Sequence, residues 1–393
     1  MRRGKKRMSE RQFLLFLIPP LAILLGTVIA LTAVMEHYSY SMDIFFGRGE
    51  RKIVQSGDTD DWDTDYYEQL FSETTGDHGS RANGAAVTKQ ITDEGIVLLK
   101  NDGILPLAEG SAVTPFGYRY VHPVYGGTGS ANTDFLQSYV CTAEEGLEKY
   151  YQVNAEVKER LFNSVPVRLT QTSAEPAKPE EGSDEFAEVS TSLYEFDPGV
   201  YAGLEDSFAG TTAFVYIGRI GGESKNLPHT PFYNDLAPYA LALTEYEKQA
   251  IAIAKEHCDA VVIILDTSNT MEIGELTEGD LEADAIVWIG GPGSMGFSSL
   301  ADILVGKIVP SGRTPDLWER NMLSSPAMQN FDEQLYTNTE DIRIAGNSGR
   351  FEQGVFFLEY EEGIYYGYRY YETACVEEKG FVYGATDAEG GCV

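Results

Sequence analysis

The sequence predicts an α/β protein: a three-layer α/β sandwich with a mainly parallel sheet, preceded by one transmembrane helix. Two observations predict this class. First, apolar runs with the length of buried strands alternate with helical segments from residue 84 onward, the order typical of doubly wound sheets. Second, an uncharged stretch near the N-terminus is long enough to cross a bilayer.

The uncharged stretch covers residues 13–34 and predicts a transmembrane signal anchor. At about 1.5 Å per helical residue it spans a hydrocarbon core of about 30 Å. Its length, and the poor match of Leu31, Thr32 and Ala33 to a cleavage site, favour an anchor over a cleaved signal peptide. Residues 1–12 are basic, so we expect them in the cytoplasm and the chain in the cell membrane, single-pass, with its body outside.

The charge of the chain excludes one class of partner. The net charge is −32, and the residues beyond position 35 hold 23 basic against 60 acidic side chains. A body this acidic is repelled by phosphate backbones, so no nucleic-acid partner is expected. Cys141, Cys258, Cys375 and Cys392 form no C-x-x-C pair, so we expect buried or incidental thiols and no zinc site.

After a polar, extracytoplasmic tether over residues 35–83, the first elements of the body follow. Val87, Ile91, Gly95 and Leu98 recur at helical spacing, and the helix gives way to an apolar run, IVLLK. The stretch AVTPFGYRY predicts a strand that enters a glycine-rich loop, and AEEGLEKYYQ predicts a second helix.

Residues 166–199 are rich in Pro, Glu, Ser and Thr, which favours a surface insertion. Order returns with a strand, TTAFVYIG, and a helix that opens at Thr244, where Glu247 completes a capping box. DAVVIILDT and DAIVWIGG predict two further buried strands.

The loop after the last of these strands contains Gly291, Gly293 and Gly296, which match G-x-G-x-x-G between a strand and a helix. A nicotinamide site is disfavoured because this fingerprint belongs to the first strand–helix turn of a sheet. The following stretch, KIVPSGRTPDLW, holds two prolines and no strand that ends in an acid. We therefore expect close packing of strand and helix, and no nucleotide.

Five segments in order resemble the α/β-sandwich domain of glycoside hydrolase family 3, the β-glucosidase and β-xylosidase family. They are EGIVLLKNDGILPL, TPFGYRYVHPVYGGTGS, FVYIGRIGGE, WIGGPGSMGFSSLADILVGKIVPSGRTPDLW and EEGIYYGYRYYET. The resemblance assigns residues 84–375 to this domain. It also implies a subgroup with reversed domain order, in which the sandwich precedes the catalytic (β/α)8 barrel.

The resemblance implies retaining hydrolysis of β-glycosides by an aspartate nucleophile on the barrel and a glutamate acid/base from the sandwich. Such an acid must carry a raised pKa to protonate the leaving oxygen. The matching position here lies in GGESKNL, so Glu223 is the candidate acid/base. Ser224 and Asn226 depart from the family's G-E-G-x-D pattern, and a solvated loop acid is the alternative for Glu223.

Other candidate residues have plainer interpretations. Gly126, Gly127, Gly129 and Ser130 either approach the sugar or form a tight turn, and His229 reads as a surface histidine. The run Tyr365, Tyr366, Tyr368, Tyr370 and Tyr371 fits packing along a strand better than stacking on sugar. The five histidines show no metal-binding spacing, so neither metal nor cofactor is expected.

A (β/α)8 barrel takes about 250 residues, and the sandwich leaves no room for one, so no nucleophile is expected in this chain. Residues 376–393 then read as a truncated tail. Two functions follow. The chain either supplies the acid/base side of a β-glucosidase-type hydrolase, inactive alone and completed by a separate barrel chain, or is a non-catalytic, membrane-anchored module that binds carbohydrate or a partner.

Overall fold

The computed structural model describes the chain from residue 9 to 392 with gaps. The described ranges are 9–38, 76–126, 140–165, 194–220, 239–330, 334–338, 343–345, 351–353, 356–377, 382–383 and 391–392. The chain divides into two units, residues 1–70 and 71–393, which are described separately.

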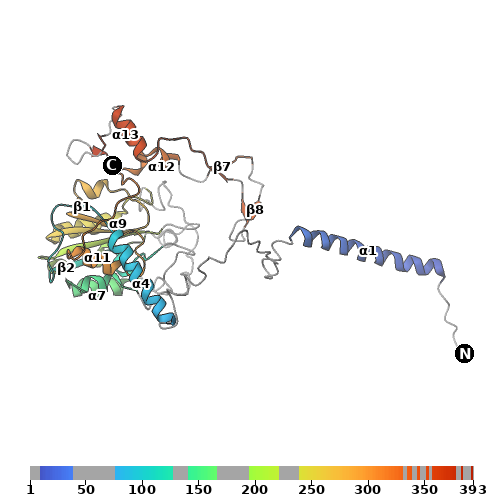
Figure 1. Cartoon of the computed structure of the whole chain (residues 1–393), viewed down its shortest axis with the longest axis horizontal. Coiled ribbons are helices and arrows are strands. Elements are labelled where there is room, and N and C mark those ends of the chain that lie inside the picture. The colour runs from blue at the N-terminus through green and yellow to red at the C-terminus, as the bar shows by residue number, and fades with distance from the viewer. Residues whose placement is uncertain are drawn as a thin grey trace, which may run out of the picture. The chain divides into compact units, whose positions relative to one another are not determined.

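The first unit contains one long helix, α1 (Glu10–His37). It includes the predicted span 13–34 and continues through Pro19 and Pro20 (Figure 1). Its stretch Phe13–His37 has a mean hydropathy of 2.6, and none of its most apolar window is buried. The helix is therefore long and apolar enough to serve as a membrane anchor or a signal sequence.

The second unit is built on a six-stranded sheet with the order β1-β6-β5-β4-β2-β3. Its strands are β1 (Val97–Asn101), β2 (Ala112–Phe116), β3 (Gln152–Val153), β4 (Thr212–Arg219), β5 (Ala260–Thr267) and β6 (Ala285–Trp288). β1 pairs with β6 antiparallel, and every other neighbouring pair is parallel. The predicted mainly parallel sheet is confirmed.

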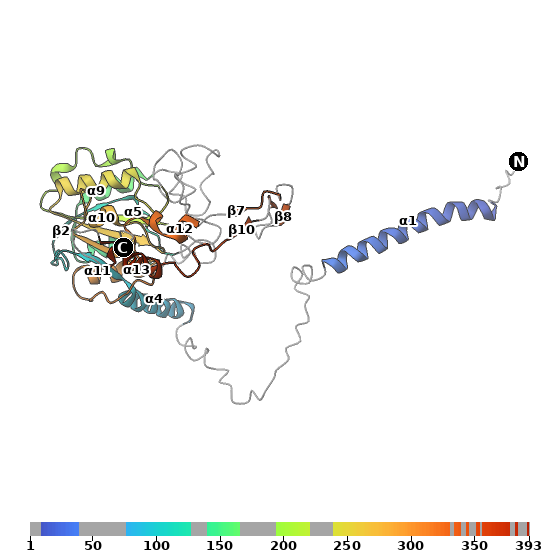
Figure 2. The same cartoon turned by 90° about the horizontal axis from the view of Figure 1, so that it is seen from above.

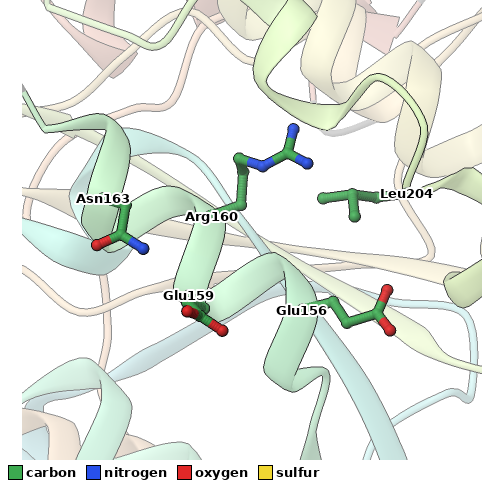
Figure 3. Close-up of a pocket in the computed structure, with 5 residues that line it drawn as sticks. All are labelled: Glu156, Glu159, Arg160, Asn163 and Leu204. Carbon is green, nitrogen blue, oxygen red and sulfur yellow. The ribbon is translucent and has the colours of Figure 1, made fainter.

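Helices cover both faces of this sheet, which gives three layers. α7 (Ala155–Ser164) and α9 (Glu245–His257) lie on one face, where both contact the short helix η4 (Pro198–Tyr201). α4 (Gly76–Gly95) and α11 (Gly296–Leu304) pack together on the other face (Figure 2). α6 (Ala143–Glu148) joins α11 there.

The core forms around β4 and β5, whose eight residues each are all buried. They pair without a break from Thr212 opposite Ala260 to Arg219 opposite Thr267. Strands covered by helices on both faces read as continuous apolar runs, which explains VVIILDT. Fully burying one of these valine, isoleucine or leucine side chains contributes about 1.5–3 kcal/mol.

The predicted start of α9 is confirmed at the level of single hydrogen bonds. The Glu247 amide donates to Thr244 Oγ1 at 3.2 Å, and the Thr244 amide donates to Glu247 Oε2 at 2.7 Å. This capping box satisfies two amides that the first helical turn would otherwise leave without partners. Thr142 and Glu145 cap α6 in the same way.

Three local predictions are corrected. The stretch AVTPFGYRY is a strand only as far as Phe116, because Gly117 turns the chain with a φ of 94° into α5 (Tyr118–Val121). A Cβ at Gly117 would lie 2.4 Å from the Tyr216 carbonyl oxygen, so no larger residue fits this turn.

The apolar stripe predicted for α4 does not face the core. Val87 and Ile91 are 56% and 64% exposed, whereas Thr92 is buried against α11. Thr92 Oγ1 lies 2.7 Å from Ser299 Oγ, and α4 reaches α11 through small hydroxyl side chains. The short side chains let the two helices approach closely, so the larger residues point away.

The tyrosine run after residue 364 does not form a strand. Tyr368–Val376 is a helix, α13, and of the five tyrosines only Tyr371 is buried. In a different part of the chain, Glu195 and Phe196 are buried although they fall near the end of the predicted surface insertion. Residues 166–193 of that insertion lie outside the described residues.

Smaller elements complete the described chain. They are η5 (Glu205–Ser207), α10 (Gly274–Thr277), η6 (Met322–Ser324), α12 (Pro326–Asn330), β7 (Gln334–Leu335), β8 (Arg343–Ala345), β9 (Phe351–Gln353), β10 (Phe356–Phe357), β11 (Val382–Tyr383) and β12 (Gly391–Cys392).

Candidate active site

The topology of the sheet marks one position for a ligand. From β2 the chain crosses to β3 on one side, and from β4 it crosses to β5 on the other side. β2 and β4 are neighbours, so the strand order reverses between them. Ligands of open parallel sheets bind outside the carboxyl ends of the strands at such a reversal.

Glu223 follows the carboxyl end of β4 by four residues, because β4 ends at Arg219. The glutamate itself lies outside the described residues, as do Gly127, Gly129, Ser130 and His229. Gly126 is described, and its Cα lies 3.8 Å from where a Cβ on Gly291 would stand. The first part of the glycine loop after β2 therefore meets the loop after β6.

The two ends of the segment that carries Glu223 are tied together by Arg219. Its guanidinium donates to both carboxylate oxygens of Glu247, at 2.7 and 2.9 Å. It also donates to the carbonyl oxygens of Ala240 and Ala242, at 2.6 and 2.7 Å. Arg219 and Glu247 are 1% and 4% exposed, so this is a buried, bidentate ion pair with further hydrogen bonds. We call it the Arg219 clamp.

A second buried carboxyl, Asp266, stands next to last in β5. Its Oδ2 accepts a hydrogen bond from the Val124 amide at 2.6 Å, while its Oδ1 has no hydrogen-bond partner among the described residues. Burial raises the pKa of Asp266 to about 8, although the Val124 amide and the charge of Arg119 oppose this rise. Asp266 thus ties the start of the glycine loop to β5.

Glu195 holds the start of α5, which precedes the same loop. Its Oε1 accepts from the amides of Tyr118 and Phe196, at 2.8 and 2.7 Å. Burial raises the pKa of Glu195 to about 8, and the charge of Glu247 adds to this rise. Arg119 is buried nearby, and its guanidinium donates to the His122 carbonyl oxygen at 3.3 Å. Two carboxyl groups that favour the protonated state therefore face the segment between β2 and the glycine loop.

The glycines of the G-x-G-x-x-G loop are in close contact with neighbouring parts of the protein. A Cβ on Gly293, whose φ is 62°, would lie 2.8 Å from Thr88 Cγ2 of α4. The Gly293 amide donates to the Tyr125 carbonyl oxygen at 2.7 Å, so it is already used within the protein. These contacts confirm the expected role of the glycines in close packing of strand, helix and neighbouring loops.

Sequence reasoning missed Asp266, Glu195 and Arg119. Asp266 stands at the end of an apolar strand, and a charged residue inside such a run is the one signal that marks it. Glu195 falls in a stretch whose composition resembles a surface segment, so nothing local indicates its burial. Within the described ranges, no group of three or more His, Cys, Asp or Glu side chains is arranged to hold a metal ion.

The fold and this site define an α/β sandwich with buried carboxyl groups at the edge where its sheet reverses. The chain matches the model of the glycosyl hydrolase family 3 C-terminal domain over residues 96–368, and it belongs to this family. This confirms the resemblance seen in the five segments.

Two curated relatives are β-glucosidases. The β-glucosidase of Ruminococcus albus is 25% identical over 295 residues, which cover 75% of this chain and 27% of that protein. β-Glucosidase A of Butyrivibrio fibrisolvens is 27% identical over 299 residues, which cover 71% of this chain and 31% of that protein. The chain thus spans less than a third of the length of either relative.

Solved structures show the same fold. A β-glucosidase from Paenibacillus barengoltzii aligns with 73% of this chain and 27% of its own, with a TM-score of 0.55 and 23% identity. β-Glucosidase 3B from Thermotoga neapolitana, solved with glycerol, aligns with 75% of this chain and 36% of its own, with a TM-score of 0.53 and 24% identity.

Proposed function

We propose that this chain supplies the acid/base side of a retaining β-glucosidase-type active site, with Glu223 as proton donor. The reversal of strand order between β2 and β4 carries the proposal, because the segment with Glu223 begins at the carboxyl end of β4. That edge is where α/β sheets bind ligands. The Arg219 clamp supports it by joining the two ends of the segment.

The proposed chemistry needs a partner. In a retaining mechanism one carboxylate attacks the anomeric carbon while a carboxylic acid, about 5–5.5 Å away, gives its proton to the leaving oxygen. The same residue then takes a proton from the water that releases the sugar. We propose that the nucleophile comes from a (β/α)8 barrel outside residues 1–393 and that these residues alone turn over no glycoside.

The experiment compares the purified full chain, a family 3 barrel made separately, and their mixture, on an aryl β-glucoside. We expect turnover only in the mixture, and its loss with Glu223→Ala. Glu256→Gln, at an exposed position of α9, is the matched control and should keep the activity. With Glu223→Ala, added azide should attack the glycosyl–enzyme bond and yield a glycosyl azide. Turnover by the chain alone, or an unaffected Glu223→Ala mixture, would overturn the proposal.

A second function is a non-catalytic, membrane-anchored module that binds carbohydrate or a partner. The exposed tyrosines beside α13 favour it, because aromatic surfaces of this kind mark interaction sites. Binding of an oligosaccharide by the chain, with no activity when any barrel is added, would support this function over the first.

We further propose that α1 is an uncleaved anchor with its N-terminus in the cytoplasm. The basic residues before the helix and its apolar length support this orientation. The test expresses the full chain in a bacterial host and adds protease outside spheroplasts. We expect the chain to resist alkaline extraction and its body to be digested. Release of a shortened soluble body would show a cleaved signal peptide instead.

A further inference from the structure

The segment before α13 exposes an unusual number of aromatic rings. Tyr360, Tyr365, Tyr366 and Tyr368 are 76%, 48%, 52% and 48% exposed, whereas the described tyrosines of residues 76–330 are buried or half-buried. We call these four residues the tyrosine ledge. Single exposed apolar residues need no explanation, but a cluster along nine residues marks an interaction site.

The ledge is held by contacts on both sides. Behind it, the Tyr371 side chain of α13 is 1% exposed, and its hydroxyl lies 2.8 Å from Ser324 Oγ. In front, Asn330 of α12 donates to the Glu359 carbonyl oxygen and, at 3.0 Å, to Glu362 Oε2. The exposed rings therefore stand on an anchored turn and helix, so little backbone ordering is needed when a ligand binds.

The rings near α13 are also ordered by one cation. The guanidinium carbon of Arg369 lies 5.2 Å from the centre of the Tyr366 ring and 5.1 Å from that of Tyr368. Cations over aromatic faces are attracted at such distances. Arg369 thus contacts two rings that each remain about half exposed.

The charges around the ledge select the class of ligand. Glu359 and Glu361, the two neighbours of Tyr360 in the chain, are exposed, and the chain as a whole is strongly acidic. Anionic lipids and nucleic acids would be repelled. A protein partner would have to desolvate these carboxylates, and interface cores are depleted in glutamate. A neutral sugar chain can stack its C–H face on a tyrosine ring, and its hydroxyl groups can donate hydrogen bonds to carboxylates.

The ledge is connected to the edge that carries the candidate active site. Ser324, which meets Tyr371, belongs to η6, and the amide of Met322 in η6 donates to Glu272 Oε2 at 3.1 Å. Glu272 lies in the loop that follows the carboxyl end of β5, and its amide donates to the Leu241 carbonyl oxygen at 2.9 Å. Leu241 in turn belongs to the segment tied by the Arg219 clamp.

We propose that the tyrosine ledge is a binding surface for a neutral oligosaccharide or polysaccharide chain. This surface requires no barrel and no bond cleavage. It therefore stands or falls independently of the proposed acid/base role.

The test measures binding of cellohexaose, xylohexaose and maltohexaose to the full chain in detergent by isothermal titration calorimetry. We expect at least one of them to bind. The double substitution Tyr360→Ala and Tyr366→Ala should raise its dissociation constant about tenfold, about 1.4 kcal/mol of binding free energy. Tyr360→Phe, which keeps the ring, should retain most of the affinity.

Phe162→Ala is the matched control, because Phe162 is an aromatic ring 41% exposed on α7, away from the ledge. Its affinity for the sugar should equal that of the unchanged chain, and the unfolding midpoint of each variant shows that it is folded. Absence of binding for all three sugars, or equal affinity in the double variant, would overturn the proposal. Ledge substitutions that instead abolish self-association would assign the surface to protein contacts.

Discussion

Two buried charged groups at the carboxyl edge of the sheet are satisfied in opposite ways. In the Arg219 clamp both ions are paired, and the guanidinium donates to two further carbonyl oxygens. Asp266 is just as buried, yet only one of its oxygens accepts a hydrogen bond among the described residues. The Arg219 clamp therefore stabilises the fold as a pair of ions at neutral pH, whereas the fold disfavours the ionised form of Asp266.

The largest effect is expected for Glu247→Ala. This substitution leaves the Arg219 guanidinium buried without its counter-ion, which costs about 3–5 kcal/mol of unfolding free energy. Denaturant unfolding followed by circular dichroism measures the loss. Glu245→Ala, at an exposed position two residues earlier, should change the value by less than about 1 kcal/mol.

The double substitution Arg219→Met and Glu247→Leu tests whether the unpaired buried charge causes the loss of stability. Replacing both ions by apolar groups of similar volume removes the unpaired charge, so we expect most of the lost stability to return. If the double variant is no more stable than Glu247→Ala, its loss of the Arg219 hydrogen bonds to Ala240 and Ala242 outweighs the removal of the buried charge.

A smaller effect, on pH dependence, is expected for Asp266. An acid whose pKa is raised from 3.8 to about 8 binds its proton more tightly in the folded state. Its contribution to the unfolding free energy is therefore full below pH 4 and is lost as the pH rises toward about 8. Glu195, with a pKa of about 8, acts in the same direction.

Asp266→Asn should remove the contribution of this carboxyl group to the pH dependence of the unfolding free energy. We expect the difference in unfolding free energy between pH 5 and pH 8 to shrink by about 2 kcal/mol, within the range set by 1.36 kcal/mol per pKa unit. Thermal unfolding at both pH values is the measurement. An unchanged slope would mean that Asp266 is already ionised at pH 5 and paired with Arg119.

The pKa of Asp302 is lowered, whereas that of Asp266 is raised. We expect Asp302 to contribute about 1–2 kcal/mol to the unfolding free energy near neutral pH. Although burial acts to raise its pKa, hydrogen bonds from Lys149, Tyr150 and Lys89 lower the pKa to about 2. Its stabilising contribution is thus present above pH 4 and is lost as the pH falls toward 2. Asp302→Asn should lower the melting temperature at pH 7 and have little effect near pH 2.

The smallest effect on stability is expected at the tyrosine ledge. Tyr360→Ala removes a ring that is 76% exposed, so the unfolding free energy should change by less than about 0.5 kcal/mol. By contrast, Tyr371→Ala removes a buried ring and should cost about 3–5 kcal/mol. Equal losses in chemical denaturation would show that the ledge packs against the protein and is not free to bind.

Much of the fold could be predicted from the sequence because its strands and helices carry strong local signals. The run VVIILDT is apolar on both faces, and Thr244 with Glu247 caps α9 through contacts within one helical turn. The candidate site was harder. Glu223 came from a resemblance, whereas Asp266 owes its raised pKa to burial, and its hydrogen-bond donor, the Val124 amide, is far away in the chain.

The sequence by itself determined the apolar N-terminal helix, the alternation of strands and helices, and the family, since these depend on neighbouring residues or on motifs in order. Only the tertiary structure decided that Val87 and Ile91 face outward and that Tyr360 is exposed. It also decided that Asp266 is buried with one oxygen that has no hydrogen-bond partner among the described residues. The burial and hydrogen-bond pairing of a side chain depend on contacts between segments that are distant in the sequence, and local periodicity carries no information about those contacts.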